Sequence, residues 1–103
     1  MTTITNHEHL DAIINKDICL IIAKTRTCGV CKNIAPRLEA NIPFLHKIDT
    51  YEIYADEMEQ FRGEHVIFSV PTILIYSKGK ELLRESRFIN YEKINRLLSR
   101  FLD

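Results

Sequence analysis

The sequence predicts an α/β fold in which a central mixed β-sheet of four or five strands is flanked by four helices. Residues 18–23 are six consecutive apolar residues, which is typical of a central strand buried on both faces and covered by helices above and below. Apolar residues recur at helical spacing in four other segments. Two β-rich segments near the C-terminal end, 72–76 and 81–88, are separated by Lys78-Gly79, a hairpin turn, and should pair antiparallel.

The first helix is expected to begin at a capping box formed by Thr5 and Glu8 and to run to about Asn15. Its inward stripe follows at helical spacing and comprises Leu10, Ile13 and Ile14. The buried strand at 18–23 comes next, followed by a polar loop at 24–27.

The second helix is expected to open at Cys28 and to bend at Pro36, which cannot donate a backbone hydrogen bond. Asn41 and Pro43 should end this helix. A weaker alternating pattern predicts a second strand within 48–55.

Two further helices complete the prediction. Asp56 with Glu59 repeats the capping pattern before a short helix that Gly63 should close. Asn90 can cap the last helix. The apolar face of that helix comprises Ile94, Leu97, Leu98 and Phe101.

Length and composition limit the class of protein. The 103 residues suit one domain, 1–103, and 46% hydrophobic with 27% charged residues is ordinary globular usage. Lysine plus arginine number 14 and aspartate plus glutamate also 14, so no net field attracts nucleic acid or an anionic membrane. No targeting segment or membrane-spanning run is evident, and we expect a cytoplasmic monomer.

The spacing of Cys28 and Cys31 carries the chemistry. Residues at i and i+3 of a helical turn have Cβ atoms about 5 to 6 Å apart, close enough to form and break a disulfide with little backbone movement. Cys28, at the exposed helix start, is the expected nucleophile because backbone N–H groups and the helix dipole favour its thiolate. Cys31 is the expected resolving thiol, and Cys19 a buried packing residue.

Two other interpretations of the cysteine pair remain open. The pair could be half of a zinc site, although zinc takes four ligands and only His46 and His65 are plausible additions, so no metal is expected. The spacing could also be chance between two inert core cysteines, but Gly29 and the preceding polar loop argue for exposure.

Three separated motifs resemble the thioredoxin family. They are Cys28-Gly29-Val30-Cys31-Lys32 followed by Ile34-Ala35-Pro36, then Val70-Pro71-Thr72, and finally Lys78-Gly79-Lys80. The resemblance implies the thioredoxin fold and a redox-active dithiol. It also implies that Pro71 is cis, that the Val70 backbone pairs with an extended partner segment, and that Thr27, Gly29 and Val30 contact the substrate.

The departures from the family pattern are specific. Thr27 stands where thioredoxins usually carry tryptophan, and Ile22 where they keep a buried acid for proton transfer. Glu52 on the neighbouring strand is a candidate substitute for that acid, although a solvated strand-edge glutamate is the alternative. Arg87 stands where glycine is common, so it should select acidic partners or narrow the groove.

The sequence therefore predicts a thiol–disulfide oxidoreductase that acts on protein disulfides, or on mixed disulfides with small thiols, through Cys28 and Cys31. No bound cofactor is required, and a separate reductase of the thioredoxin-reductase type should recharge the dithiol. The alternative is a non-catalytic module on the same scaffold that senses oxidation or binds a protein partner. A metal carrier that uses both cysteines and a histidine is a third candidate.

Overall fold

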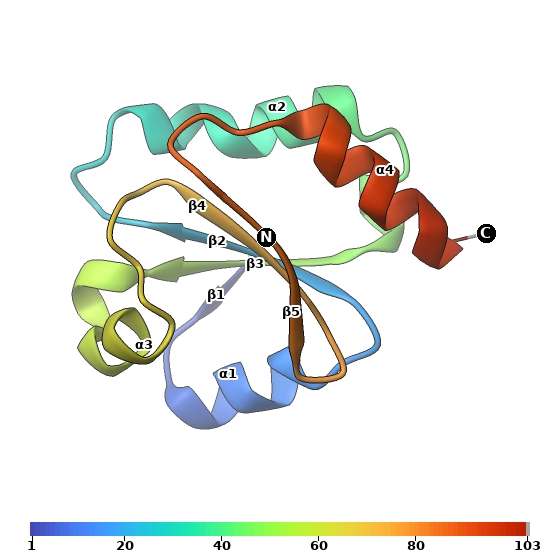
Figure 1. Cartoon of the computed structure of the whole chain (residues 1–103). Helices are drawn as coiled ribbons and strands as arrows, with labels where there is room; N and C mark the ends of the chain where they lie inside the picture. Colours follow the sequence, from blue (N-terminus) through green and yellow to red (C-terminus); the bar gives the residue numbers. More distant parts are fainter. Residues whose placement is uncertain (103) are drawn as a thin grey trace.

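A five-stranded mixed sheet forms the centre of the molecule, with two helices on each face (Figure 1). The computed structural model describes residues 1–102. The strands are β1 (Thr2–Ile4), β2 (Cys19–Lys24), β3 (Asp49–Tyr54), β4 (Thr72–Ser77) and β5 (Lys80–Ser86). The helices are α1 (His7–Ile14), α2 (Ile34–Asn41), α3 (Glu59–Glu64) and α4 (Tyr91–Leu102), with short 3₁₀ turns η1 (Val30–Asn33), η2 (Leu45–Lys47) and η3 (Ala55–Glu57).

The sheet has the strand order β1-β3-β2-β4-β5. β3 lies parallel to both β1 and β2, whereas β4 is antiparallel to β2 and β5 is antiparallel to β4. This confirms the predicted mixed sheet with four flanking helices. The individual segments predicted four strands, and they missed β1 because it has only three residues, of which Ile4 alone is buried.

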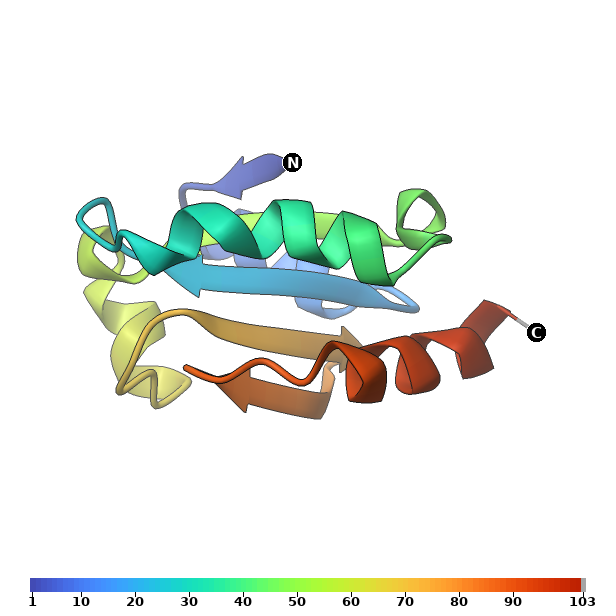
Figure 2. The same ribbon diagram turned by 90° about the horizontal axis from the view of Figure 1, so that it is seen from above.

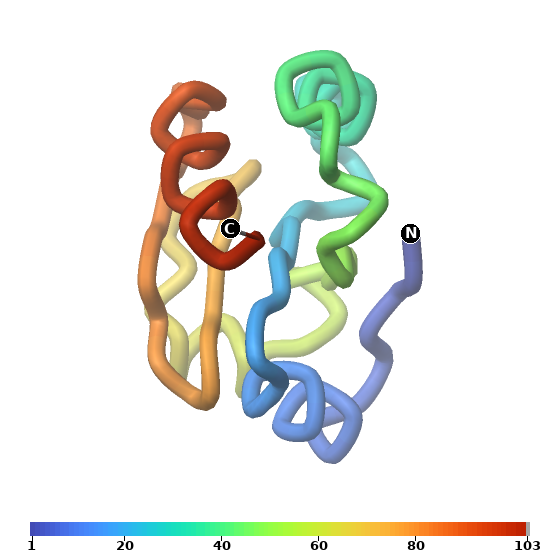
Figure 3. Tube along the Cα trace, turned by 90° about the vertical axis from the view of Figure 1, so that its right-hand side faces the viewer, coloured from blue at the N-terminus to red at the C-terminus, as the bar shows by residue number. Residues whose placement is uncertain are grey.

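Two apolar layers cover the two faces of the sheet. α1 and α3 pack on one face and α2 and α4 on the other, as Figures 1 and 3 show from two directions. β2 contributes to both layers, since residues 19–23 are each at most 1% exposed. The prediction of a strand buried on both faces is confirmed, as is the burial of Cys19 within it.

The strand register brings three segments that are distant in sequence to the same end of the strands. Ala23 near the end of β2 pairs with Thr72 at the start of β4, and Thr72 pairs with Ser86 at the end of β5. The loops that follow β2, precede β4 and follow β5 therefore lie together. Seen from above, α2 and α4 lie side by side over one of the two faces of the sheet (Figure 2).

The capping predictions hold at only one of three helices. Asn90 caps α4, because its Oδ1 accepts a bond of 3.0 Å from the backbone N–H of Lys93. The cap of α1 is Asn6 rather than Thr5, with a bond of 2.7 Å from the His9 N–H to the Asn6 side chain. Asp56 does not cap α3, since it lies in η3 and Met58 takes the cap position.

The predicted end of the third helix is also wrong. Gly63 lies inside α3, and the chain turns instead at Val66, whose φ is 54°. A β-branched residue seldom adopts this left-handed conformation. Arg84 on β5 stabilises the turn, because its guanidinium donates to the carbonyls of His65 and Val66 at 2.7 and 2.9 Å.

The dithiol helix begins differently from the prediction. Its first turn is the 3₁₀ turn η1, which starts at Val30, and regular α-helix begins only at Ile34. Pro36 is therefore the third residue of α2, within the first turn, where backbone N–H groups have no partner inside the helix. The irregularity expected at Pro36 lies at the junction of η1 and α2, and the helix ends at Asn41 as predicted.

The C-terminal hairpin forms as predicted around Lys78 and Gly79, whose φ angles are 50° and 85°. β5 ends at Ser86 rather than Phe88, because Arg87 adopts a φ of 62° and leaves the strand. On α4, Ile94 and Leu98 are fully buried and Leu97 packs partly against the core. The fourth predicted core residue, Phe101, remains 41% exposed.

Within residues 1–102, no helix combines the length and the apolar character that crossing a membrane would need.

Candidate active site

Cys28 and Cys31 form a disulfide just beyond the C-terminal end of the central strand β2. Their Cα atoms are 5.4 Å apart, a separation that is typical of disulfides. Cys28 is partly exposed in the loop before η1, whereas Cys31 inside η1 is only 4% exposed. The structure thus confirms the pair and the greater exposure of Cys28. It also shows that Cys28 precedes the helix instead of lying on its first turn.

A hollow of about 210 Å³ opens beside the disulfide and has a basic lining. Both cysteines line it together with Lys24, Thr25, Arg26, Lys32 and Tyr54. The guanidinium of Arg26 lies 3.6 Å above the Tyr54 ring and donates to Glu57 at 2.7 Å, which offsets its charge. Lys32 forms no ion pair with any residue in the described range.

Ile22, which the resemblance places at the position of a buried acid, is 1% exposed in the apolar layer beneath α2. Its register partner on β3 is Glu52. Glu52 contacts Lys24 Nζ at 2.8 Å and accepts a bond of 2.7 Å from the Thr3 hydroxyl. Burial opposes ionisation of Glu52, but the bonds from Lys24 and Thr3 outweigh it and lower the pKa of the carboxyl.

Glu52 is therefore neither a freely solvated glutamate nor part of the hollow that holds the sulfur atoms. Its carboxylate reaches that hollow only through Lys24, which lines it. The two side chains are 17% and 20% exposed. This arrangement links an acid on β3 to the dithiol by way of a lysine on β2.

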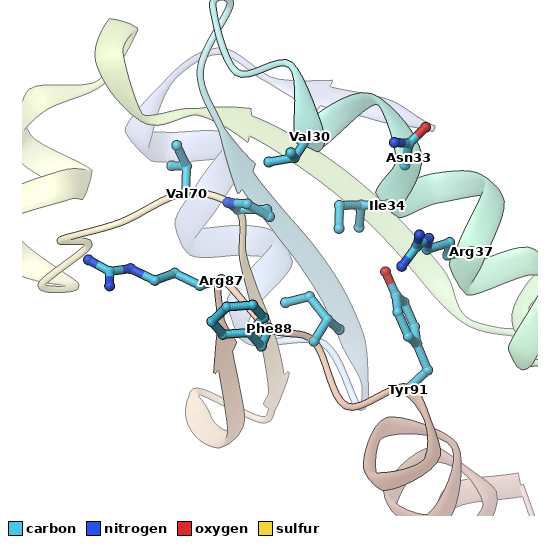
Figure 4. Close-up of a pocket in the computed structure, with 10 residues that line it drawn as sticks. Val30, Asn33, Ile34, Arg37, Val70, Arg87, Phe88 and Tyr91 are labelled. Atoms are coloured by element: carbon cyan, nitrogen blue, oxygen red, sulfur yellow. The ribbon is translucent and has the colours of Figure 1, made fainter.

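Val70 and Pro71 form the opposite wall of the site, and their peptide bond is cis, as the resemblance implies. The backbone N–H of Arg87 donates to the Pro71 carbonyl at 2.9 Å, so the end of β5 is tied to this wall. A groove of about 580 Å³ runs from here towards α4 (Figure 4). Its lining comprises Val30, Asn33, Ile34, Arg37, Val70, Pro71, Arg87, Phe88, Ile89 and Tyr91.

The predicted substrate contacts are distributed unevenly around this groove. Val30, Val70, Pro71 and Arg87 line it, and Val30 is 64% exposed. Thr27 and Gly29 are exposed beside the cysteines but do not line the groove. No atom lies within 4 Å of the position that a Cβ on Gly29 would occupy, so the surface there is open.

The sequence interpretation missed Arg37, Phe88 and Tyr91. A signal for Arg37 exists, because Val30, Ile34 and Arg37 recur at the spacing of one helix face that begins beside the dithiol. Phe88 is 93% exposed at the rim of the groove. It follows Arg87, whose left-handed backbone is not evident from the local sequence pattern.

The two histidines considered as metal ligands have other surroundings. His46 is exposed on η2, and His65 Nδ1 shares a hydrogen bond of 2.8 Å with the Tyr76 hydroxyl. Over the part of the chain that is described, no group of three His, Cys, Asp or Glu side chains is arranged to hold a metal ion.

The profile of the thioredoxin family matches residues 1–100. The chain is 33% identical over 73 residues to the thioredoxin-like protein YdfQ of Bacillus subtilis, an alignment that covers 71% of this chain and 65% of that relative's length, just under two thirds. It is 24% identical to the thioredoxin of Chlamydia trachomatis over 97% of this chain and 98% of the relative. Among solved structures, Fasciola hepatica thioredoxin superposes with a TM-score of 0.80 at 25% identity, covering 97% of this chain and 98% of the other.

Proposed function

Because this chain belongs to the thioredoxin family, we propose that it is a thiol–disulfide oxidoreductase that reduces disulfides in other proteins, or mixed disulfides with small thiols, through Cys28 and Cys31. The observation that carries this function is the Cys28–Cys31 disulfide just beyond the end of β2, with the more exposed sulfur on Cys28. The cis Pro71 wall beside it supports docking of an extended segment.

The reaction needs only the two cysteines and a partner disulfide. The Cys28 thiolate attacks one sulfur of the partner, the partner S–S bond breaks, and the leaving sulfur takes up a proton. Cys31 then loses its proton and attacks the Cys28 sulfur in the mixed disulfide, which releases the second partner thiol. Two electrons and two protons reach the partner, and the chain returns to the disulfide form. A separate reductase of the thioredoxin-reductase type reverses that oxidation, and no bound cofactor takes part.

Lys24 and Glu52 would assist this reaction. Lys24 lines the hollow that contains both cysteines, and a positive charge there would favour thiolate over thiol. Glu52 holds the Lys24 ammonium group in place and is the candidate acid for proton transfer, acting through Lys24. This pair would serve in place of the buried acid that thioredoxins usually carry at the position of Ile22.

We also propose a compartment and an oligomeric state for the chain. A cycling dithiol of this kind suits a reducing compartment such as the cytoplasm. The chain would work there as a single-domain monomer, with a size that suits one folding unit.

Turnover of a protein disulfide in the presence of a thioredoxin reductase tests this function. The unmodified chain should reduce the substrate catalytically, and Cys28→Ser should abolish turnover because the attacking sulfur is gone. Cys19→Ser is the matched control, since it removes the thiol that has no place in the site. Absence of turnover by the unmodified chain would instead indicate a non-catalytic module on the same scaffold.

A further inference from the structure

The groove of Figure 4 has apolar walls and a cationic character. Val30 and Ile34 line one side, Val70 and Phe88 line the other, and Ile89 adds to the apolar lining. Its charged lining residues are Arg37 and Arg87, and no aspartate or glutamate lines it. Apolar walls suit the side chains of an extended segment, and the two guanidinium groups favour carboxylates.

Neither arginine is neutralised within the structure. The ion pairs found among residues 1–102 involve Lys16, Lys24, Arg26, Arg84 and Lys93, each with its own carboxylate. Arg37 and Arg87 form none of them. Both guanidinium groups are therefore available to a carboxylate that a partner brings.

The charged residues that line the surface around the dithiol are all basic. The groove and the two smaller hollows beside Cys28 and Val70 are lined by six basic residues and by no acidic residue, although the whole chain carries equal numbers of both. Glu52 and Glu57 offset Lys24 and Arg26. The other four basic residues, Lys32, Arg37, Arg62 and Arg87, have no ion-pair partner in the described range. A neutral chain thus presents a positive face at its reactive end.

The two arginines lie at opposite ends of the groove. The Arg87 side chain extends on the Val70 side, where its backbone is tied to Pro71, and Arg37 lies beside the Tyr91 hydroxyl (Figure 4). Burial raises the pKa of Tyr91, and the positive charge of Arg37 opposes that rise, which is consistent with their proximity. A segment lying along the groove would meet one positive charge on the Val70 side and a second beside Tyr91 at the start of α4.

We propose that Arg37 and Arg87 make this groove selective for acidic segments of partner proteins, in which carboxylates lie on either side of the cysteine that Cys28 attacks. This inference rests on the proposed oxidoreductase function and names its substrate class. Charge pairing at the rim acts mainly on the rate of encounter and on the choice of partner, so it should appear as a rate preference among otherwise equal substrates.

Three synthetic peptides of equal length test the inference. Each carries one cysteine in a disulfide with a neutral 2-thiopyridyl group, flanked by aspartates, asparagines or lysines, and the reduced chain is mixed with each while thiopyridone release is followed. The acidic peptide should react fastest, by about two- to fivefold for each arginine engaged, and the lysine peptide slowest. The preference should decrease as ionic strength rises.

Variants assign that preference to the two residues. Arg37→Gln and Arg87→Gly should each reduce the ratio of the acidic to the neutral rate, and the double variant should bring it close to one. Glycine is used at position 87 because the φ of 62° suits it. Arg87→Lys should retain most of the ratio, since it keeps the charge. Arg96→Gln on the exposed side of α4 is the matched control and should leave the ratio unchanged.

The outcomes separate the two levels of proposal. No reaction with any peptide would contradict the oxidoreductase function itself. Rapid reaction with all three at equal rates, or a ratio that survives the double variant, would overturn the acidic selectivity alone. A small anionic disulfide that reacts as fast as the acidic peptide, with the same dependence on both arginines, would also overturn it by assigning the arginines to a small thiol.

Discussion

Lys24 and Glu52 form an ion pair of 2.8 Å across β2 and β3, next to Ile22 on the same face of the sheet. Their side chains are 20% and 17% exposed, so water screens the pair only in part. Lys24 lines the hollow that holds the disulfide, and the pair connects β2, which leads into the dithiol, with β3, whose Tyr54 also lines that hollow. It therefore bears on stability as well as on the chemistry of the sulfur atoms.

Glu52→Gln should lower the free energy of unfolding at pH 7 by about 1–2 kcal/mol, between the values typical of exposed and buried pairs. The folded-state pKa of Glu52 is lowered, so its contribution is present above the ordinary pKa of about 4.3 and is lost as the pH falls through the folded value. Urea unfolding of both proteins should therefore show a difference at pH 7 that shrinks below about pH 4. Glu39→Gln on the exposed surface of α2 is the control, and a difference that persists in acid would contradict the pairing.

Cys31→Ser should accumulate a stable mixed disulfide between Cys28 and the partner, because the thiol that resolves it is absent. Mass spectrometry under non-reducing conditions would detect the adduct after incubation with a protein disulfide. Cys28→Ser is the paired variant and should form little adduct, since Cys31 is only 4% exposed. Equal trapping by both variants would overturn the assigned roles.

Cys19 should be inert in the folded protein. It is fully buried on β2, and burial raises the pKa of its thiol to about 11. Alkylation of the reduced chain near pH 8 should modify Cys19 slower than a free cysteine by about a hundredfold or more, because so little thiolate is present. Peptide mapping after labelling would measure this, with denaturant restoring the reaction. Rapid labelling in the native state would show that Cys19 is accessible.

Lys78→Asn should stabilise the chain by about 0.5–1 kcal/mol, because Lys78 has a φ of 50° in a two-residue turn that favours Asn-Gly. The Lys78 side chain is exposed, so the substitution removes little packing. Lys78→Val is the opposing variant and should destabilise, since a β-branched residue tolerates positive φ poorly. Thermal unfolding would rank the three proteins, and any order other than Asn, Lys, Val would contradict this account of the turn.

The dithiol and the cis Pro71 segment could be predicted because each is a local motif. The sequence spacing of Cys28 and Cys31 determines how far apart they lie within one turn of the chain. The resemblance to the thioredoxin family predicted the cis isomer at Pro71. The remainder of the site could not be predicted in the same way. Arg37, Phe88 and Tyr91 come from separate segments, and nothing local in the sequence places them around one groove.

The sequence alone determined the α/β class, the strand buried on both faces, the Lys78-Gly79 hairpin and the redox pair, because each follows from periodicity or spacing within a few residues. The tertiary structure decided the edge strand β1, the caps at Asn6 and Met58 and the positive φ at Arg87. It also decided that the ends of β2 and β5 meet the start of β4. These features depend on register between distant strands and on which competing cap packs best. Such long-range contacts outweigh the weak preferences of any one segment.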